Sequence, residues 1–272
     1  MTNIETFELI GFNNVKFLVD RFFHTKSKKI IVFCHGFKGF KDWGGFNYIA
    51  NYFVTKSITF YKFNFSHNGT SLVNPTEICD FEKFSQNNFT KELFDLNQLI
   101  NYVEVNEDLS NKELILIGHS RGGGISIIKS SEDARIKRLI TWCSPSDFFN
   151  KLDSDKIKLW KERKVIYVDN KRTNQKLPLD YQFYIDCIKN KNNYDILNCC
   201  NKIDVPHLVQ HAKNDETVDY SEALKIYKNS KKSKLIYYDS NHVFGMTHPF
   251  KKSNCNKVLD KVLSDTSVFL ET

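Results

Sequence analysis

The sequence predicts an α/β fold in which a mostly parallel sheet carries helices on both faces. Short strand-like runs alternate along the chain with helical stretches of about ten or more residues, the pattern of strand–helix–strand units. Several strand-like runs, such as residues 29–34, are apolar throughout, as expected of strands covered on both faces. The chain has 272 residues, 41% of them apolar, and we expect a single domain spanning residues 1–272.

The predicted elements follow one another in a regular order. Two β-type runs, 7–11 and 15–19, flank the hairpin signal Gly11-Phe12-Asn13-Asn14. A long helix is indicated at 88–105, where apolar residues recur at spacings of three and four. Further strands are predicted at 29–34, 58–63, 112–117, 138–142, 205–211 and 234–238, and further helices at 43–53, 220–227 and 256–270.

The segment 145–198 breaks this alternation. It holds a β-type run at 164–169, a turn-like stretch at 170–176 that includes Arg172, and a helical stretch at 181–189. This segment lacks the strand–helix alternation and separates two strands of the expected sheet. We therefore predict that residues 145–198 form a subdomain inserted into the α/β domain.

The net charge of +7 comes from scattered lysines and short clusters such as Lys26-Ser27-Lys28-Lys29. A nucleic-acid surface would need basic residues gathered on one face among exposed aromatic residues, so no nucleic-acid partner is expected. The N-terminal residues show no secretory signal, and no apolar run approaches the roughly 20 residues that span a bilayer. We therefore expect a soluble, cytoplasmic protein that does not associate with membranes.

Seven cysteines are present, and no two have C-x-x-C spacing. Cys199 and Cys200 are adjacent in sequence and poorly placed for a disulfide, so we interpret the cysteines as reduced thiols in a reducing compartment. No group of His, Cys and Asp residues has the spacing of metal ligands, and we expect neither a metal ion nor a cofactor.

The motif Gly118-His119-Ser120-Arg121-Gly122 follows the apolar strand at 112–117 and precedes a stretch that can form a helix. In this context a Gly-x-Ser-x-Gly motif places its serine on a sharp turn, with the hydroxyl exposed above a sheet. Gly118 and Gly122 fit because strand and helix pack closely at such a turn. An ordinary glycine-rich turn is the alternative interpretation of the motif taken alone.

A serine hydroxyl becomes an effective nucleophile when a base takes its proton, and that base needs an orienting group. Because loops at the carboxyl ends of parallel strands share one crevice, both partners should follow later strands. Asp215 follows the strand at 205–211, and His242 follows the strand at 234–238. Ser120, Asp215 and His242 therefore predict a catalytic triad in the order serine, acid, histidine.

Three other residues compete for the roles of acid and base. Asp219 lies just before the helix at 220–227 and is better explained as a helix cap. Asp239 lies only three residues before His242, and His248 lies too far beyond the strand end to serve as the base.

Acyl transfer also needs two N–H groups that bind the oxyanion of the reaction intermediate. The residue after the nucleophile, Arg121, supplies one backbone N–H at the start of a helix. The loop His35-Gly36-Phe37 follows the strand at 29–34, and we expect the Phe37 N–H to be the second donor. His35, just past the strand, is expected to shape this loop rather than to react.

Four segments together resemble the α/β-hydrolase superfamily: Phe33-Cys34-His35-Gly36-Phe37, Gly118-His119-Ser120-Arg121-Gly122-Gly123, Asp215, and Ser240-Asn241-His242-Val243-Phe244. The chain looks closest to its prolyl-oligopeptidase-like and dienelactone-hydrolase-like branch and is similar to small cinnamoyl or feruloyl esterases. The resemblance covers nearly the whole chain. It implies the α/β-hydrolase fold and a lid formed by residues 145–198.

The leading hypothesis is a serine hydrolase that cleaves small-molecule carboxylic esters through an acyl-enzyme on Ser120. The substrate should lie between the sheet and the lid, against Trp160 and Tyr167. A peptidase or amidase of the same fold is the first alternative, because it would use the same triad. A ligand-binding protein without catalytic activity is the second, although such proteins usually lack a triad member.

Overall fold

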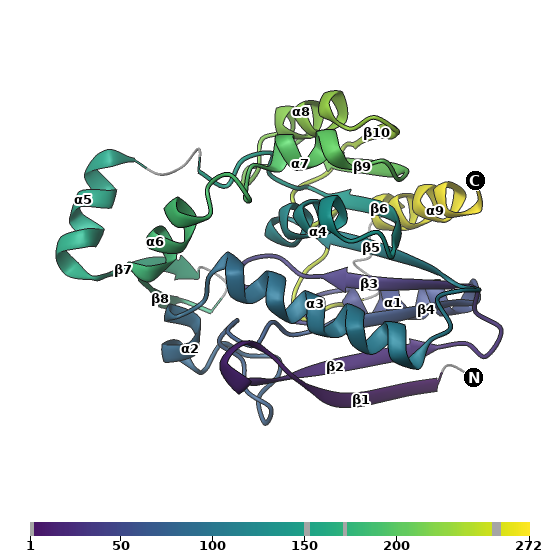
Figure 1. Ribbon diagram of the computed structural model, residues 1–272, viewed down its shortest axis with the longest axis horizontal. Helices are drawn as coiled ribbons and strands as arrows, with labels where there is room; N and C mark the ends of the chain where they lie inside the picture. The colour runs from purple at the N-terminus through teal and green to yellow at the C-terminus, as the bar shows by residue number, and fades with distance from the viewer. Residues whose placement is uncertain (1–2, 150–152, 171–172, 252–256) are drawn as a thin grey trace.

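The computed structural model describes residues 3–149, 153–170, 173–251 and 257–272. Its central sheet has eight strands in the order β1-β2-β4-β3-β5-β6-β9-β10 (Figure 1). The pairs β1–β2 and β2–β4 are antiparallel and the other neighbouring pairs are parallel, which confirms the predicted, mostly parallel sheet. The strands are β1 Asn3–Ile10, β2 Lys16–Phe23, β3 Lys29–Cys34, β4 Ile58–Phe63, β5 Glu113–His119, β6 Ile136–Trp142, β9 His207–Ala212 and β10 Ser233–Tyr238.

Helices cover both faces of this sheet. Side chains of α3, α4, α7 and α8 join the buried cluster on one face, and those of α1 and α9 join the cluster on the other (Figure 1). The helices are α1 Phe46–Thr55, α2 Phe81–Ser85, α3 Phe89–Asn106, α4 Arg121–Glu132, α5 Ser154–Arg163, α6 Gln182–Lys189, α7 Ile196–Lys202, α8 Ser221–Asn229 and α9 Lys257–Glu271, with a short 3₁₀ turn, η1, at Phe12–Asn14.

Strand β3 shows why an unbroken apolar run is a strand here. Ile30, Val32 and Cys34 enter the cluster under α3 and α4. Ile31 and Phe33 point the opposite way and enter the cluster under α1 and α9. Because successive side chains of a strand point to opposite faces, both sets must be apolar when helices cover both faces.

From β3 onward the predicted boundaries of the main body lie within three residues of those in the structure, whereas the first two strands, predicted at 7–11 and 15–19, are longer than expected. Helix α3 begins at Phe89, because the side chain of Asn88 accepts a hydrogen bond from the Lys91 N–H at 3.0 Å and caps the helix. The helix predicted from 43 begins at Phe46. Asn256, the expected start of the last helix, lies outside the described part of the chain, where α9 is seen from Lys257.

Between β6 and β9 the chain forms α5, β7 (Val165–Asn170), β8 (Gln175–Asp180), α6 and α7. Strands β7 and β8 pair antiparallel in a small sheet of their own. The expectation of a turn across 170–176 is wrong at its end, because Gln175 already pairs with Asn170 in this hairpin; Arg172 lies outside the described residues. Helix α7 packs on α4 and α8, so the end of this segment belongs to the main body.

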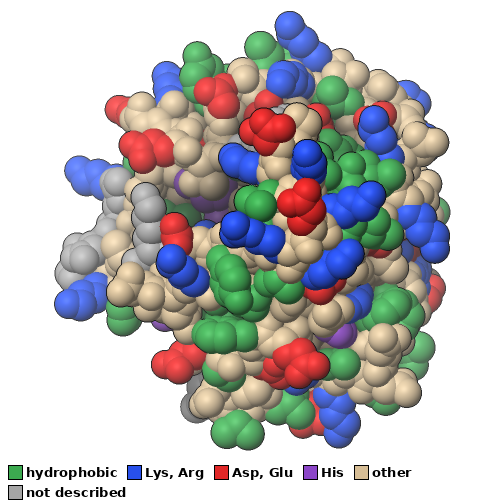
Figure 2. Space-filling view, turned by 90° about the vertical axis from the view of Figure 1, so that its left-hand side faces the viewer, with side chains coloured by type: hydrophobic (Ala, Val, Ile, Leu, Met, Phe, Trp, Pro, Cys, Tyr) green, Lys and Arg blue, Asp and Glu red, His purple; other side chains and the backbone are tan. Residues whose placement is uncertain are grey.

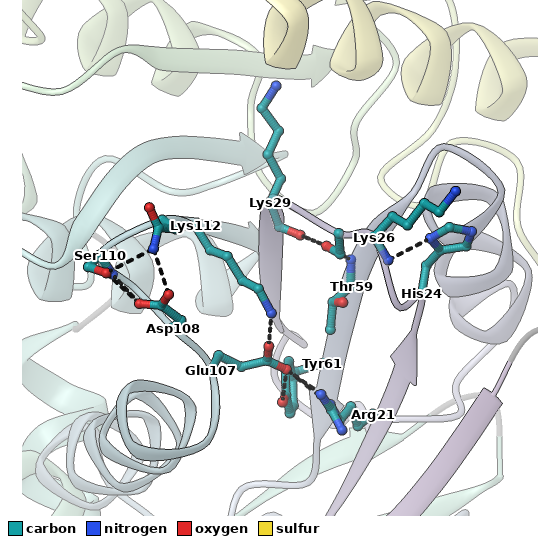
Figure 3. A network of polar contacts seen from close by, with 12 residues as sticks. Arg21, His24, Lys26, Lys29, Thr59, Tyr61, Glu107, Asp108, Ser110 and Lys112 are labelled. Atoms are coloured by element: carbon teal, nitrogen blue, oxygen red, sulfur yellow. Dashed lines mark hydrogen bonds and ion pairs between the residues drawn. The ribbon is translucent and has the colours of Figure 1, made fainter.

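A buried carboxylate organises the end of the sheet where β3, β4 and β5 begin (Figure 3). The Glu107 side chain is 1% exposed and accepts hydrogen bonds from Arg21 Nη2 at 2.6 Å, Tyr61 OH at 2.9 Å and Lys112 Nζ at 2.5 Å. Burial raises the pKa of Glu107, but the hydrogen bonds from Lys112, Tyr61 and Arg21 outweigh it and hold that pKa below its ordinary value. This network ties the antiparallel strand β2 to the parallel part of the sheet.

Candidate active site

Ser120 stands between the end of β5 and the start of α4 with backbone angles φ 55° and ψ −125°. A positive φ is unfavourable for a residue with a Cβ, so the surrounding packing must hold this turn in place. A Cβ at Gly118 would lie 2.2 Å from the Gly122 carbonyl oxygen, and one at Gly122 would lie 2.3 Å from that of Cys34. Both glycines of the motif are therefore required by the close approach of strand and helix.

Asp215 and His242 meet in the loops after β9 and β10. His242 Nδ1–H donates to Asp215 Oδ2 at 2.7 Å, and the other carboxylate oxygen accepts from the backbone N–H groups of Thr217 and Val218 at 2.8 and 2.9 Å. Burial would raise the pKa of the Asp215 carboxyl, but hydrogen bonds from His211 and His242 outweigh it, and that pKa lies well below its ordinary value. Asp215 is thus an anion that can orient the imidazole.

Two further histidines support this pair. His211 is fully buried, and its Nε2 lies 3.3 Å from Asp215 Oδ2 and 3.0 Å from the Val218 carbonyl oxygen. His119 Nε2–H donates to the backbone carbonyl of His242 at 2.9 Å, and burial lowers the pKa of His119 to about 3. Sequence reasoning did not find these roles; the only signal for His211 is its place at the end of the strand that precedes Asp215.

Ser120 and His242 line the same cavity, which has a volume of about 470 Å³. Figure 2 shows the face that carries the small β7–β8 sheet, with a hollow in which histidine side chains are visible. In this structure the His242 ring bonds to Asp215 through Nδ1 and makes no hydrogen bond with the Ser120 hydroxyl, so the two groups must approach each other for proton transfer. The lining residues are Gly36, Phe37, Lys38, Gly39, Trp43, Phe46, His119, Ser120, Asp169, Asn170, Glu216, Thr217, His242 and Val243.

The loop after β3 approaches the serine closely. A Cβ at Gly36 would lie 2.9 Å from the Ser120 Cβ, so only glycine fits there without a shift of the turn. The next residue, Phe37, lines the cavity, and Arg121 is the first residue of α4, where backbone N–H groups lack intrahelical acceptors. Across the described chain, neither the Phe37 nor the Arg121 N–H has an acceptor.

His35 holds this loop from within. It is buried, and Nδ1–H donates to the Gly36 carbonyl at 2.9 Å, while Nε2 faces the Asn68 side-chain amide at 3.4 Å. Burial lowers the pKa of His35 to about 4, so the ring is neutral at pH 7. These contacts agree with the expectation that His35 shapes the loop.

The competing residues are engaged elsewhere. Asp239 accepts a hydrogen bond from the Asn214 side chain at 2.7 Å, and Asp219 accepts from the Ser221 N–H at 2.9 Å at the start of α8, as a capping residue does. His248 Nδ1 accepts from the Gly44 N–H at 3.0 Å and is absent from the lining of the Ser120 cavity.

The structure does not place Trp160 or Tyr167 in this cavity. Trp160 is 3% exposed and packs inside the 145–198 segment, where Nε1–H donates to the Leu179 carbonyl at 2.9 Å. Tyr167 is 65% exposed, because its position on β7 points it to solvent. Asp169 and Asn170, at the end of the same strand, line the cavity instead.

One group of side chains in the described part has donor atoms close enough for a metal ion: Cys143, Asp215 and His242, within 4.8 Å of one another. Burial and the neighbouring Asp215 raise the pKa of the Cys143 thiol well above its ordinary value, whereas a metal ligand must be a thiolate. A metal ion would also have to break the hydrogen bond between Asp215 and His242. The group therefore fits an acid–base pair with a protonated thiol beside it better than a metal centre.

The strand order, the positive-φ serine turn after β5 and the loops after β9 and β10 define the α/β-hydrolase fold. Solved structures share this fold along nearly the whole chain. The α/β-hydrolase GrgF from Penicillium sp. sh18 has a TM-score of 0.76 at 15% identity, with 99% of this chain and 98% of that chain covered. Est1E from Butyrivibrio proteoclasticus has a TM-score of 0.69 at 14% identity, with 98% and 99% covered.

The esterase Pf2001 from Pyrococcus furiosus is similar as well, with a TM-score of 0.66 at 16% identity and 99% and 91% of the two chains covered. No protein-family model matches the chain. No curated protein matches its sequence either. The likeness is therefore one of fold.

Of the helices in the described ranges, none combines the length and the apolar character needed to cross a bilayer. The six cysteines seen in the structure are all free; the seventh, Cys255, lies outside the described ranges.

Proposed function

We propose that this protein is a serine hydrolase that cleaves small carboxylic esters, with Ser120, His242 and Asp215 as nucleophile, base and orienting acid. The observation that carries the proposal is one arrangement: a serine held at positive φ above the sheet shares a cavity with a histidine that is hydrogen-bonded to a buried carboxylate. This is the constellation that serine acyl transfer requires.

In the first half of the reaction, Ser120 Oγ attacks the acyl carbonyl carbon while His242 Nε2 takes the hydroxyl proton. The carbonyl oxygen becomes an oxyanion, which the free N–H groups of Phe37 and Arg121 bind. The bond to the alcohol then breaks, and His242 returns its proton to the leaving alkoxide. Asp215 stabilises the imidazolium that exists between these steps.

In the second half, water replaces the alcohol. His242 takes a proton from the water as its oxygen attacks the acyl-enzyme, a second oxyanion forms in the same place, and the acid is released as Ser120 regains its proton. Each step is carried by side chains and backbone groups of this chain.

The cavity suits a substrate of modest size with an apolar part. Phe37, Trp43, Phe46 and Val243 supply apolar walls within the volume of about 470 Å³. The similar protein Pf2001 is an esterase, and Est1E has also been solved with ferulic acid bound. Esters of small aromatic acids are therefore the first substrates to test, beside short p-nitrophenyl esters.

The test compares the wild type with Ser120→Ala and His242→Ala on a p-nitrophenyl ester. We expect the wild type to hydrolyse it and both variants to lose at least about three orders of magnitude in kcat, since nucleophile and base act as a unit. A fluorophosphonate should label the wild type at Ser120. Equal rates for wild type and Ser120→Ala would contradict the proposal.

The peptidase or amidase alternative is separated by matched substrates. An ester and an amide with the same acyl group share the acyl-enzyme, so only the leaving group differs. We expect the ester to be cleaved far faster. A larger kcat/KM for the amide would assign the protein to the alternative, with the same triad.

A further inference from the structure

The side chain of Arg121 is buried beside the nucleophile, although the proposed mechanism uses only its backbone N–H. Its guanidinium lies over the Phe37 ring, with Cζ 3.8 Å from the ring centroid. The two residues that supply the oxyanion donors, one from the loop after β3 and one from α4, therefore also touch through their side chains.

Other aromatic rings close around the same guanidinium. Arg121 Cζ lies 5.2 Å from the centroid of Phe89 on α3 and 5.3 Å from that of Phe183 on α6. The Arg121 side chain is only 15% exposed, and a cation over aromatic rings is held more strongly when water is excluded. Its ion pair with Glu92, at 3.4 Å, is long for a charged pair, so the guanidinium is held by the rings as well as by this carboxylate.

Phe183 is fixed in this position by the way α6 docks on the start of α3. Thr90 Oγ1–H donates to Asp186 Oδ1 at 2.5 Å, and Asn88 Nδ2 donates to Gln182 Oε1 at 2.7 Å. The segment between β6 and β9 is thus hydrogen-bonded to the start of α3 and contacts the residue after Ser120 through Phe183.

We propose that the Arg121 side chain is a positioning residue of the oxyanion hole: its guanidinium, enclosed by Phe37, Phe89 and Phe183, holds the loop that carries the Phe37 N–H against the start of α4. The inference rests on the proposed function and deepens it. It makes Phe183, a residue of the inserted segment, part of the support for catalysis.

The test measures kcat, KM and affinity for a trifluoromethyl ketone in Arg121→Met. When Ser120 Oγ adds to the ketone carbonyl, its proton passes to His242 and the resulting oxyanion occupies the oxyanion hole. Loss of one oxyanion donor costs about 10²–10³ in kcat, so a loosened donor should cost about 10- to 100-fold. We expect KM to stay within about threefold and the ketone to bind more weakly by the same factor as kcat/KM falls.

Two further substitutions, one at Arg121 and one at Phe183, test whether the contact between the guanidinium and the rings is what matters. Arg121→Lys keeps the charge but loses the planar group that stacks on a ring, so we expect it to recover only part of kcat. Phe183→Leu should lower kcat by a smaller factor, and its effect should not add to that of Arg121→Met because the residues are in contact. If Arg121→Met folds poorly with Glu92 left unpaired, Arg121→Met with Glu92→Gln removes both charges together.

Arg138→Met is the matched control. Arg138 also contacts a phenylalanine, with Cζ 5.7 Å from the Phe269 ring, but it lies in β6, near the end of the sheet opposite Ser120. We expect this control to leave kcat unchanged.

The outcomes separate this inference from the proposed function. A wild type that neither hydrolyses esters nor reacts with a fluorophosphonate would overturn the proposed function and this inference with it. An active wild type whose Arg121→Met variant keeps kcat within threefold would overturn the inference alone. So would a fall in kcat without weaker binding of the trifluoromethyl ketone.

Discussion

Ser120 keeps its unfavourable backbone angles because nothing larger than glycine fits at the neighbouring positions. Gly118 and Gly122 let β5 and α4 meet at van der Waals distance, and the turn between them can then only point its hydroxyl into the cavity. The same contact explains why the motif could be interpreted from the sequence: the spacing of the two glycines is dictated by the turn.

At the same scale, His211 is predicted to tune the orienting acid. His211→Leu removes the Nε2–H beside Asp215 and should lower kcat by about tenfold or more, since a hydrogen bond to a charged group contributes about 1.5–3 kcal/mol. His211→Gln retains a donor and should lose less. Steady-state kinetics of both variants test this, and equal losses would show that His211 contributes packing rather than a hydrogen bond.

The sequence did not reveal the side-chain contacts of three residues, because each depends on how the chain folds back on itself. The side chains of His119 and Arg121 point toward groups distant in the chain, and the buried His211 side chain turns back toward Asp215, four residues on. Spacing along a sequence reveals where strands end, and hence Ser120, Asp215 and His242. It does not reveal which buried side chain meets which loop, so Trp160 and Tyr167 were placed in the cavity and lie outside it.

At the scale of elements, the Glu107 network should determine how firmly β2 and β4 are held at the start of the sheet. Glu107→Gln removes the carboxylate partner of Lys112 and leaves Arg21 with Glu5 alone, which should lower the free energy of unfolding by about 3 kcal/mol. We expect little change in kcat, because Glu107 and Lys112 lie before the start of β5, whereas Ser120 follows its end.

Glu8→Gln is the comparison for that variant. Glu8 pairs with Lys16 at 2.8 Å, with side-chain exposures of 39% and 57%, so its loss should cost no more than about 1 kcal/mol. Urea unfolding of both variants measures the difference. A similar decrease in the free energy of unfolding for the two variants would show that the burial of Glu107 does not increase its contribution to stability.

The elements most poorly predicted lie between β6 and β9. Strand β8 begins with Gln175 and Lys176, polar residues that look like a turn, and it contains Pro178, which is unusual within a strand. It forms because the two-stranded β7–β8 hairpin packs Leu177 and Leu179 into the buried cluster. Tertiary burial outweighs local preference there, whereas in the central strands both agree.

For the whole molecule, the buried histidines predict a loss of stability in mild acid. Burial lowers the pKa of His35 to about 4 and those of His119 and His207 to about 3, against an ordinary value of about 6.5 in the unfolded chain. As the pH falls below about 6.5, the unfolded chain binds protons that the folded chain does not, so the free energy of unfolding decreases, down to about pH 4 for His35 and about pH 3 for His119 and His207.

The measurement is the free energy of unfolding at several pH values between 7 and 5, for the wild type and His207→Asn. Each histidine contributes up to about 1.4 kcal/mol per pH unit, so the variant should show a shallower slope by about that amount. The lowered pKa of Asp215 also makes the free energy of unfolding decrease with falling pH, but only below about pH 4. Identical slopes for the two proteins would contradict the assignment to His207.

The contact between Phe183 and Arg121 limits how such a protein can change its substrates. A segment between two strands of a sheet could in general be exchanged between related proteins without an effect on the catalytic residues. Here an exchange that omits the phenylalanine would also disturb the nucleophile turn. If the proposed function holds, directed evolution toward new substrates should therefore begin at Asp169 and Asn170, which line the cavity from the same segment between β6 and β9, and keep Phe183 constant.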